Sequence, residues 1–304
     1  MYDVIVVGGS YAGISAALQL ARARRRVLVL DAAQRRNRFA SSSHGFLGQD
    51  GQAPEAIGAK GRAELLAYPT VAWREASVAE AQSIPGGFAV RAGTDEYQSK
   101  RVIVATGVVD ELPAVPGLTE RWGKTVFHCP YCHGYELERG RLGVLASSPL
   151  SMHMAALVSE WGAPGQTTFF LNGAFEPDAE QLADLASRAI QVEREFVIRA
   201  EGEAPGIDLR LRDGRTSRFD GLFVLPRTLI KDRFASQLGC ELEEGLLGLF
   251  YKTDATKETT VPGVFACGDV AIGGPGSVSF AVADGVRAGI STHQSLVFRR
   301  EPRD

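Results

Sequence analysis

The chain of 304 residues contains four cysteines, and two of them, Cys129 and Cys132, stand close together. Two cysteines at this spacing can form a disulfide that opens and closes by exchange with an external thiol. A zinc site would also use such a pair, but a closed structural site needs four ligands. Cys240 and Cys267 are isolated from each other and have no histidine neighbours. The pattern therefore favours redox chemistry over metal binding, and the cysteines are too few for a secreted disulfide scaffold.

Histidines flank this pair, with His128 before Cys129 and His133 after Cys132. Imidazole titrates near neutral pH, so His133 is a candidate base for an incoming thiol or acid for a departing one. The alternative is that His133 only caps or packs against a helix. We expect that helix to start near Cys132, with Pro130 fixing the turn, because unpaired N–H groups at a helix start stabilise a thiolate. The catalytic candidates are therefore Cys129, Cys132 and His133.

The beginning of the chain has the pattern of a βαβ unit that binds a dinucleotide. Residues 2–7 are dominated by β-branched, apolar residues, which is typical of a strand buried on both faces of a parallel sheet. A helix is predicted over about 14–24 and a second buried strand over 27–30. Asp31 closes that strand, where its carboxylate can accept hydrogen bonds from the ribose hydroxyls of adenosine.

The turn between the first strand and the helix is rich in glycine. Gly8 allows a tight turn, and Gly13 lets the helix and the strand approach closely. Ser10 replaces the usual middle glycine, which still leaves a small residue where a pyrophosphate must approach the backbone. Nucleotide binding is therefore predicted for the whole turn, which consists of Gly8, Gly9, Ser10, Tyr11, Ala12 and Gly13.

Several later segments have a predicted place around this unit. A polar loop over 35–51 is unusually long for a compact domain, unless it has a role or is a surface excursion. One buried strand ends at Ala105-Thr106-Gly107, and prolines and glycine over 112–117 predict an extended linker. Another buried strand ends at Gly268-Asp269, directly before a helix predicted over 277–291. Ligands of open α/β sheets bind at such strand ends, although Asp269 could also be a turn or capping residue.

A second βαβ pattern begins with a strand at 142–146, a helix at 152–161 and a strand at 167–171. Its turn has no glycine, and Pro149 removes one of the backbone donors that a phosphate would use. No Lys or Arg occurs from Trp161 to Ala186, so nothing local could pair with the 2′-phosphate of NADPH. This part resembles a nucleotide domain without its fingerprint.

Composition excludes several other classes of function. Lys and Arg number 33 against 36 Asp and Glu, a net charge of -3, so no broad basic field exists to bind nucleic acid or acidic lipid. The dense basic run Arg22 to Arg26 closes a predicted helix, where cations complement the negative end of the dipole. No apolar run approaches the ~20 residues of a membrane span. We expect a cytoplasmic protein without membrane or nucleic-acid partners.

The motifs GGSYAG at 8–13, ATG at 105–107, CPYC at 129–132 and PGVFACGD at 262–269 together resemble low-molecular-weight thioredoxin reductases. Their order and spacing match the family over nearly the whole chain. The resemblance implies an α/β fold of two Rossmann-like three-layer domains. A discontinuous FAD domain would cover 1–113 and 228–304. A smaller pyridine-nucleotide-type domain, 114–227, would be inserted between them and carry the cysteine pair, and the resemblance also implies a homodimer.

The resemblance also implies which residues hold FAD. Asp31 would bind the ribose and Val78 the adenine, through its backbone. The turn from Gly8 to Gly13 would hold the pyrophosphate. The remaining positions would be Ala105, Thr106 and Gly107 as a wall of the site, Gly268 and Asp269 at the ribityl chain, and Val278 at the edge of the flavin ring.

Three departures separate this chain from typical reductases. The NADPH motifs are missing between Ala146 and Glu180, His133 stands where an Asp commonly acts as proton donor, and Gly276-Ser277 replace Arg-Gln. The segments CPYCHGYE at 129–136 and HGFLGQDG at 44–51 instead resemble a branch that includes oxygen-dependent dithiol oxidases. By this resemblance NAD(P)H use is doubtful, Cys132 would face the flavin, and Cys129 would exchange with the substrate.

The sequence therefore supports three readings of function. The first is an FAD-dependent oxidase of a small dithiol or a thioredoxin-like protein, with oxygen or a protein as the other electron partner. The second is an NAD(P)H-dependent thioredoxin reductase with an unusual nucleotide site. The third is a redox-inactive, flavin-binding regulatory protein. The roles of His128 and His44 stay open, with His44 a candidate for the flavin site or the substrate pocket.

Overall fold

The structure is a computed structural model that describes residues 1–298, and its contacts divide into two compact units. The first unit contains Met1–Arg38, Pro54–Val109 and the chain from Thr228 onward. The second unit contains Phe39–Ala53 and Asp110–Arg227. Most of the polar loop over 35–51, which the sequence had left in the first domain, is thus grouped with the cysteine pair, whereas its residues up to Arg38 stay in the first unit.

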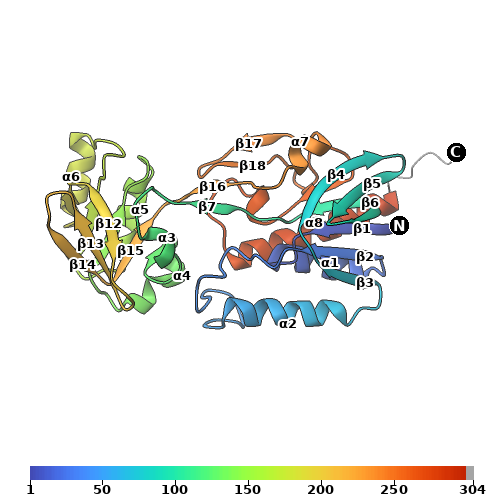
Figure 1. The fold of residues 1–304 in the computed structure, drawn as a ribbon, viewed down its shortest axis with the longest axis horizontal. Coiled ribbons are helices and arrows are strands. Elements are labelled where there is room, and N and C mark those ends of the chain that lie inside the picture. The colour runs from blue at the N-terminus through green and yellow to red at the C-terminus, as the bar shows by residue number, and fades with distance from the viewer. Residues whose placement is uncertain (299–304) are drawn as a thin grey trace. The chain divides into compact units, whose positions relative to one another are not determined.

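The first unit is built on a seven-stranded mixed sheet (Figure 1). Its parallel part has the order β3-β2-β1-β6, and β19 pairs with the other edge of the last part of β6. These strands are β1 (Tyr2–Val7), β2 (Val27–Asp31), β3 (Val71–Glu75), β6 (Asp95–Val104) and β19 (Val264–Ala266). The antiparallel strand β5 (Gly87–Ala92) pairs with the first half of β6, and β4 (Val78–Ile84) pairs with the other edge of β5.

Alternate residues of the parallel strands belong to two separate cores. Ile5 and Val7 point into one core, whereas Val4 and Val6 point into the other. Both faces of β1 are therefore covered, which explains why its sequence is apolar without alternation.

Helix α1 (Tyr11–Arg22) packs along α8 (Val278–Phe298). The other elements of the first unit are α2 (Pro54–Leu66), α7 (Phe234–Leu238), the hairpin of β17 (Leu242–Glu244) and β18 (Leu249–Tyr251), and the 3₁₀ helix η2 (Asp269–Ala271). Helix α8 extends seven residues beyond its predicted end. Its polar residues Thr292 and Ser295 are buried and donate hydrogen bonds to the helix carbonyls of Ala288 and Thr292, so their polarity does not end the helix.

The second unit is centred on a five-stranded parallel sheet with the order β11-β10-β9-β15-β8. These strands are β8 (Val126–Phe127), β9 (Leu142–Leu145), β10 (Thr167–Phe170), β11 (Gln191–Glu193) and β15 (Gly221–Val224). A three-stranded antiparallel sheet consists of β12 (Val197–Glu201), β13 (Ile207–Leu211) and β14 (Thr216–Phe219). The helices are α3 (Leu118–Arg121), α4 (Pro130–His133), η1 (Tyr135–Leu137), α5 (Ser151–Val158) and α6 (Ala179–Ser187).

Two short strands lie where the chain crosses between the units. Strand β7 (Val109–Glu111) pairs with β16 (Arg227–Leu229) in a two-stranded sheet.

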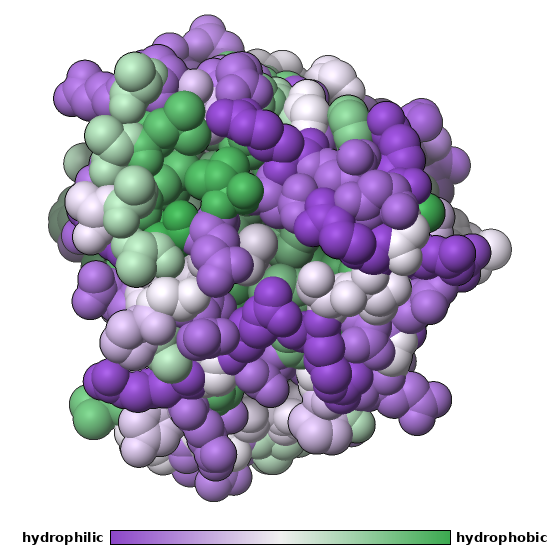
Figure 2. Space-filling view, turned by 90° about the vertical axis from the view of Figure 1, so that its left-hand side faces the viewer, coloured by the Kyte–Doolittle hydropathy of each residue, from purple (hydrophilic) through white to green (hydrophobic). Residues whose placement is uncertain are grey.

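Figure 2 shows the surface on the side where Figure 1 labels α6 and β12–β14. This surface is largely hydrophilic and has one area where hydrophobic residues gather.

The packing of α1 on α8 leaves no room for side chains at two glycines of α8. A Cβ at Gly285 would lie 2.1 Å from the carbonyl oxygen of Ala12, and one at Gly289 would lie 2.4 Å from that of Ala16. Gly285 and Gly289 are four residues apart, and so are Ala12 and Ala16, so one turn of α8 lies on one turn of α1. The helices can approach this closely only because glycine presents bare backbone.

We predict that Gly285→Ala lowers the free energy of unfolding by about 1–3 kcal/mol, because the added methyl group overpacks the contact with α1. Helix propensity alone would give a gain of about 1 kcal/mol. Urea unfolding of the apoprotein measures the change. Gly58→Ala in α2 is the matched control, because only the flexible end of Arg35 stands in its way, and it should be neutral or stabilising. Equal effects of the two substitutions would contradict the packing argument.

Candidate functional site

The glycine turn after β1 is closed against the end of β6. Gly8 has a φ of 106°, in the left-handed region, and a Cβ there would lie 2.2 Å from the carbonyl oxygen of Ala105. A Cβ at Gly13 would lie 1.8 Å from the carbonyl oxygen of Gly8. Any side chain at either position would push the turn away from the strand ends, so the sequence explanation of both glycines agrees with the local geometry.

The first turn of α1 has the donors that a pyrophosphate needs. Ser10 is the N-cap residue, but its side chain makes no capping hydrogen bond, and the first turn contains no acidic residue. The N–H groups of a first helical turn have no partner within the helix, and the dipole makes that end positive. The residues from Ser10 to Gly13 therefore fit the pyrophosphate of FAD.

Asp31 and Val78 lie beside this turn. Gly9 donates its N–H to the Asp31 carboxylate at 3.0 Å, so the side chain that we expect at the ribose is also held against the turn. The N–H of Ala76 donates to the carbonyl oxygen of Asp31 at 2.9 Å. This hydrogen bond places the start of β4, where Val78 is the first residue, next to the end of β2.

Ala105, Thr106 and Gly107 follow β6 and continue into the same region. Ala105 donates its N–H to the carbonyl oxygen of Val7 at 2.8 Å, and Gly107 has a φ of 67°. The Thr106 hydroxyl donates to the Asp232 carboxylate at 2.6 Å. The sequence analysis missed Asp232 because it is 126 residues away.

A buried tyrosine strengthens this hold on Thr106. The Tyr251 hydroxyl donates to the other oxygen of the Asp232 carboxylate, which also accepts from the N–H of Phe234 at 3.1 Å. Burial raises the pKa of Tyr251, followed by the charge of Asp232, so Tyr251 is a neutral hydrogen-bond donor. Asp232 therefore ties the end of β6 to the segment that returns from the second unit.

Gly268 and Asp269 follow β19 at the same sheet edge. The guanidinium of Arg36 lies 2.9 Å from the Asp269 carboxylate, and both side chains are largely buried. The sequence analysis did not identify Arg36 as a site residue. The only signal was the long polar loop that contains it, because Arg36 and Asp269 are 233 residues apart. This pair places a cation at the sheet edge where we expect a cofactor that carries two phosphates.

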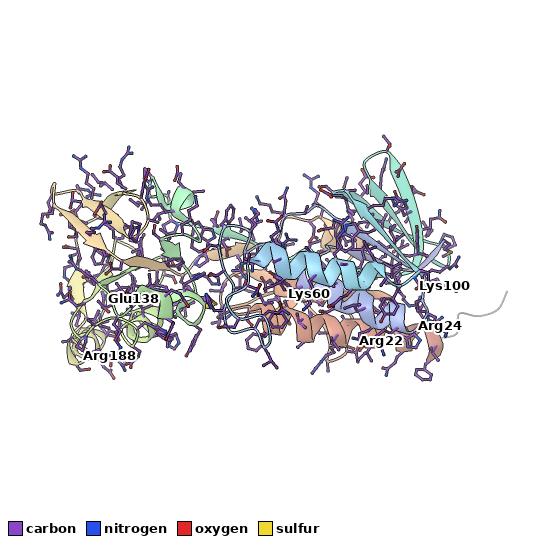
Figure 3. All side chains as sticks on the ribbon, turned by 90° about the horizontal axis from the view of Figure 1, so that it is seen from below. Arg22, Arg24, Lys60, Lys100, Glu138 and Arg188 are labelled. Atoms are coloured by element: carbon purple, nitrogen blue, oxygen red, sulfur yellow. A yellow bond between two sulfur atoms is a disulfide. The ribbon has the colours of Figure 1, made fainter. Side chains whose placement is uncertain are left out.

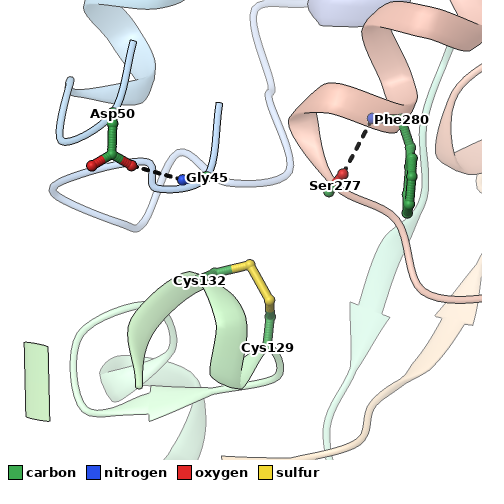
Figure 4. The surroundings of a disulfide bond; sticks show 6 residues. All are labelled: Gly45, Asp50, Cys129, Cys132, Ser277 and Phe280. Atoms are coloured by element: carbon green, nitrogen blue, oxygen red, sulfur yellow. Dashed lines mark hydrogen bonds between the residues drawn. A yellow bond between two sulfur atoms is a disulfide. The ribbon is translucent and has the colours of Figure 1, made fainter. Parts of the chain in front are cut away.

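Val278 is the first residue of α8. The hydroxyl of Ser277 accepts a hydrogen bond from the N–H of Phe280 at 3.2 Å, as expected for a residue that caps a helix start (Figure 4). The residues predicted to hold FAD thus belong to one unit and lie at the strand ends or at helix starts that follow them.

Cys129 and Cys132 form a disulfide in the second unit, with their Cα atoms 5.3 Å apart (Figure 4). The helix α4 between them is a single turn. Cys129 is its N-cap, Pro130 its first residue, and the N–H of Cys132 donates to the carbonyl oxygen of Cys129 at 3.2 Å. The expected helix start near Cys132 was therefore placed two residues late, because Pro130 occupies the first helical position that proline favours. Both cysteines therefore lie at the start of this helical turn.

His133 ends α4, and its ring stacks on Phe127 with the ring centres 4.5 Å apart. Burial lowers the pKa of His133 to about 4, with smaller contributions from the charges of His128 and His44. The imidazole is therefore neutral at physiological pH. Its unprotonated nitrogen can accept a proton or a hydrogen bond there, but a pKa of about 4 makes it a weak base, and it carries no proton to give to a leaving thiolate.

His44 lies in the loop that the structure groups with the cysteine pair. Its Nε2 atom is 3.4 Å from the Glu136 carboxylate and its Nδ1 atom is 3.6 Å from that of Asp50. Asp50 also accepts a hydrogen bond from the N–H of Gly45 at 2.8 Å (Figure 4). Glu136 is four residues after Cys132, so His44 connects the loop to the segment directly behind the disulfide.

His128 precedes the disulfide on the other side. Its ring centre lies 5.9 Å from that of Trp122, in a tilted arrangement. The chain thus gathers His44, His128 and His133 in one unit with the cysteine pair, as their electrostatic effects on His133 indicate. Within residues 1–298, no group of three or more metal-ligating side chains is arranged to hold a metal ion.

The turn after β9, where the second unit would hold a nucleotide, is occupied by internal hydrogen bonds. The Ser147 hydroxyl donates to the carbonyl oxygen of Leu225 at 2.6 Å, and its N–H donates to the Ser151 hydroxyl at 3.1 Å. The N–H and the hydroxyl of Ser147 are therefore both used within the unit.

In the described part of the chain, no helix has the length and apolar character needed to cross a membrane.

Comparison with known proteins identifies the family. Residues 2–285 match the family described as pyridine nucleotide-disulphide oxidoreductase. The thioredoxin reductase sirT of Leptosphaeria maculans is 33% identical over an alignment of 307 positions, which covers 95% of this chain and 92% of that protein.

Two solved structures resemble the whole chain. An oxidoreductase from Agrobacterium tumefaciens is 50% identical with a TM-score of 0.94 and covers 98% of this chain and 99% of its own. A putative thioredoxin reductase from Bacillus anthracis is 30% identical with a TM-score of 0.92 and covers 99% of this chain and 100% of its own. The predicted α/β fold of two Rossmann-like domains is confirmed.

The resemblance drawn from the sequence motifs is therefore confirmed as well, and it extends to the enzyme class. The chain belongs to the pyridine nucleotide-disulphide oxidoreductase family and is an FAD-dependent disulfide oxidoreductase of the thioredoxin-reductase type.

Proposed function

We propose that this enzyme oxidises a dithiol through Cys129 and Cys132 and passes the electrons to FAD without using NADPH. The observation that carries the proposal is the closed disulfide directly before His133, whose imidazole is neutral and able to accept a proton. The substrate would be a small dithiol or a thioredoxin-like protein. The homodimer and the cytoplasmic location expected from the sequence stay predictions.

The first step would be attack by the sulfur of one substrate thiol on the Sγ of Cys129. His133 would take the proton from that thiol as the new S–S bond forms. The bond between Cys129 and Cys132 breaks, and Cys132 leaves as a thiolate. The second substrate thiol, after losing its proton, attacks the substrate sulfur of the mixed disulfide. The substrate then leaves as a disulfide, and Cys129 becomes a thiolate that can be protonated.

The reduced cysteines, Cys129 and Cys132, must then pass the two electrons to another group. FAD held in the first unit would supply the two-electron chemistry for this, so that the net reaction of dithiol and oxygen gives disulfide and hydrogen peroxide while the disulfide of Cys129 and Cys132 closes again. The side chains that would hold FAD are those at the strand ends of the first unit, including Asp31, Arg36 and Asp269. By the resemblance to the family, we assign Cys132 to the flavin side and Cys129 to the substrate.

The independence from NADPH is argued from the second unit. Ser147 uses its N–H and hydroxyl internally, and Pro149 offers no N–H to a phosphate. No Lys or Arg occurs from Trp161 to Ala186.

The names of the relatives favour a nucleotide-dependent enzyme instead, because the family is named for pyridine nucleotides and sirT for thioredoxin reduction. An NAD(P)H-dependent reductase is therefore the second candidate.

We predict that Cys129→Ser abolishes dithiol oxidation. Wild-type enzyme in air, without nucleotide, should form equal amounts of peroxide and substrate disulfide from dithiothreitol, because each turnover moves one electron pair. Peroxide and disulfide are measured together. Cys240→Ala is the matched control, because Cys240 is buried and burial raises the pKa of its thiol. It should retain wild-type turnover.

Two results would contradict this part of the proposal. Unchanged turnover in Cys129→Ser would favour the regulatory reading, in which the cysteines do not exchange with an external thiol. Peroxide or disulfide that forms only when NADPH is supplied would favour a nucleotide-dependent enzyme.

We also predict a particular pH dependence for His133. His133→Gln should slow dithiol oxidation at pH 7, but by less than the roughly 100-fold expected for loss of a general base whose pKa matches the operating pH, because a pKa of about 4 makes His133 a weak base. The pKa of His133 is lowered from 6.5 to about 4, so its base form persists well below pH 6 and is lost only near pH 4. The ratio of wild-type to variant rates, measured from pH 4 to 8, should stay constant down to about pH 5 and then fall.

Taking this ratio removes the titration of the substrate thiols, which is common to both proteins. A ratio that already falls through pH 6.5 would show that His133 titrates as an exposed imidazole. A ratio near one at all pH values would show that His133 only packs on Phe127.

A further inference from the structure

Lys257 is an unusual residue in the first unit. It is only 9% exposed, and its φ of 67° lies in the left-handed region that disfavours residues with a side chain. A lysine carries a desolvation cost when buried, and its backbone conformation adds strain. Such a residue persists only where its surroundings hold it.

The contacts of Lys257 explain how it is held. Its Nζ atom lies 3.1 Å from the Asp284 carboxylate and donates to the carbonyl oxygen of Ala271 at 3.2 Å. Its own carbonyl oxygen accepts from the N–H of Ala266 at 3.0 Å. The second oxygen of Asp284 accepts from the N–H of Gly268 at 2.9 Å. The Lys257–Asp284 pair therefore joins the end of β19, the turn after it, and α8.

The pair holds both ends of the turn from Gly268 to Ala271. Asp284 binds the first N–H of this turn, and Lys257 binds its last carbonyl. Gly268 has a φ of 76°, and a Cβ there would lie 2.8 Å from the Cβ of Ala12, so the turn lies against the first turn of α1. Asp269, between the two held ends, carries the carboxylate that pairs with Arg36.

We propose that Lys257 and Asp284 are positioning residues that fix the Gly268–Ala271 turn in the conformation that binds FAD. This inference rests on the proposed role of Gly268 and Asp269 in holding the cofactor. Neither side chain is assigned to touch FAD. They act through the turn, because a site whose backbone is held before binding loses less conformational freedom when the ligand arrives.

A purely structural role would not need these charges. Replacing a buried ion pair by apolar residues is often neutral or stabilising, whereas removing one partner leaves an unpaired charge. The pair also satisfies a backbone donor and a backbone acceptor of a turn that has few regular hydrogen bonds. The charged pair and the left-handed backbone of Lys257 are explained if they hold the turn that binds the cofactor.

The test measures FAD release from purified holoprotein and FAD binding to the refolded apoprotein, with thermal unfolding of both. Lys257→Met should raise the FAD dissociation constant by roughly tenfold or more, which is the size of effect seen for residues that orient the ligands of a bound metal without touching it. Lys257→Arg should recover part of the affinity, because it keeps a cation that can reach Asp284. Asp284→Leu should weaken binding at least as much as Lys257→Met, because Gly268 loses its acceptor.

Arg24→Met is the matched control. Arg24 is also a cationic residue in the left-handed region, with a φ of 57°, but it is exposed just after α1 ends (Figure 3). Its replacement should leave FAD affinity unchanged.

The outcomes separate the two levels of the argument. FAD affinity within about twofold of wild type in both Lys257→Met and Asp284→Leu, together with lower thermal stability, would overturn the positioning role. If either variant does not fold, Lys257→Gln decides, because it removes the cation but keeps a polar side chain. Faster FAD release without loss of apoprotein stability supports the role, and unchanged release overturns it. A wild-type protein that binds no FAD would instead contradict the cofactor assignment itself.

Discussion

The close backbone contact around α1 is the constraint on which the first unit depends. The first turn of this helix lies against the carbonyl group of Gly8, which leaves no room for a Cβ at Gly13, and against Gly268 and Gly285, where a Cβ would meet Ala12. Bare backbone is needed because the helix start must present its N–H groups at the ends of β1, β6 and β19. The proposed cofactor site therefore follows from how closely three chain segments can approach one helix.

The two units apply the same architecture differently. The first keeps a glycine turn with an uncapped helix start and a nearby cation, Arg36. In the second, hydrogen bonds of Ser147 occupy the corresponding turn after β9. The candidate reactive side chains of this unit are instead the disulfide of Cys129 and Cys132 and the histidines near it. Phosphate binding and thiol chemistry are thus separated between two Rossmann-like domains. This division is consistent with an enzyme that links a disulfide to FAD.

Much of the fold and part of the candidate site could be predicted from sequence, because the signals are local. The run from Tyr2 to Asp31 contains a strand, a turn, a helix and a second strand, and each is set by neighbouring residue types. The Cys129 and Cys132 pair is local in the same sense, and the disulfide forms across one helical turn. The predicted helix start missed only the role of Pro130.

The parts that sequence reasoning missed depend on contacts between distant segments. Arg36 meets Asp269, and Asp232 meets Thr106, only after the chain has passed through the second unit and returned. A basic residue in a polar loop has no local pattern that names its partner. The lowered pKa of His133 likewise depends on burial against Phe127, which the sequence does not display.

Anaerobic reduction of the flavin is the most direct test of the central claim, that electrons enter through the cysteine pair and not from a nicotinamide. Flavin-loaded protein would be mixed separately with dithiothreitol, NADPH and NADH while the flavin absorbance is followed. The account predicts rapid bleaching by the dithiol and none by either nucleotide. Rapid bleaching by NADPH would contradict it and would make the enzyme a nucleotide-dependent reductase.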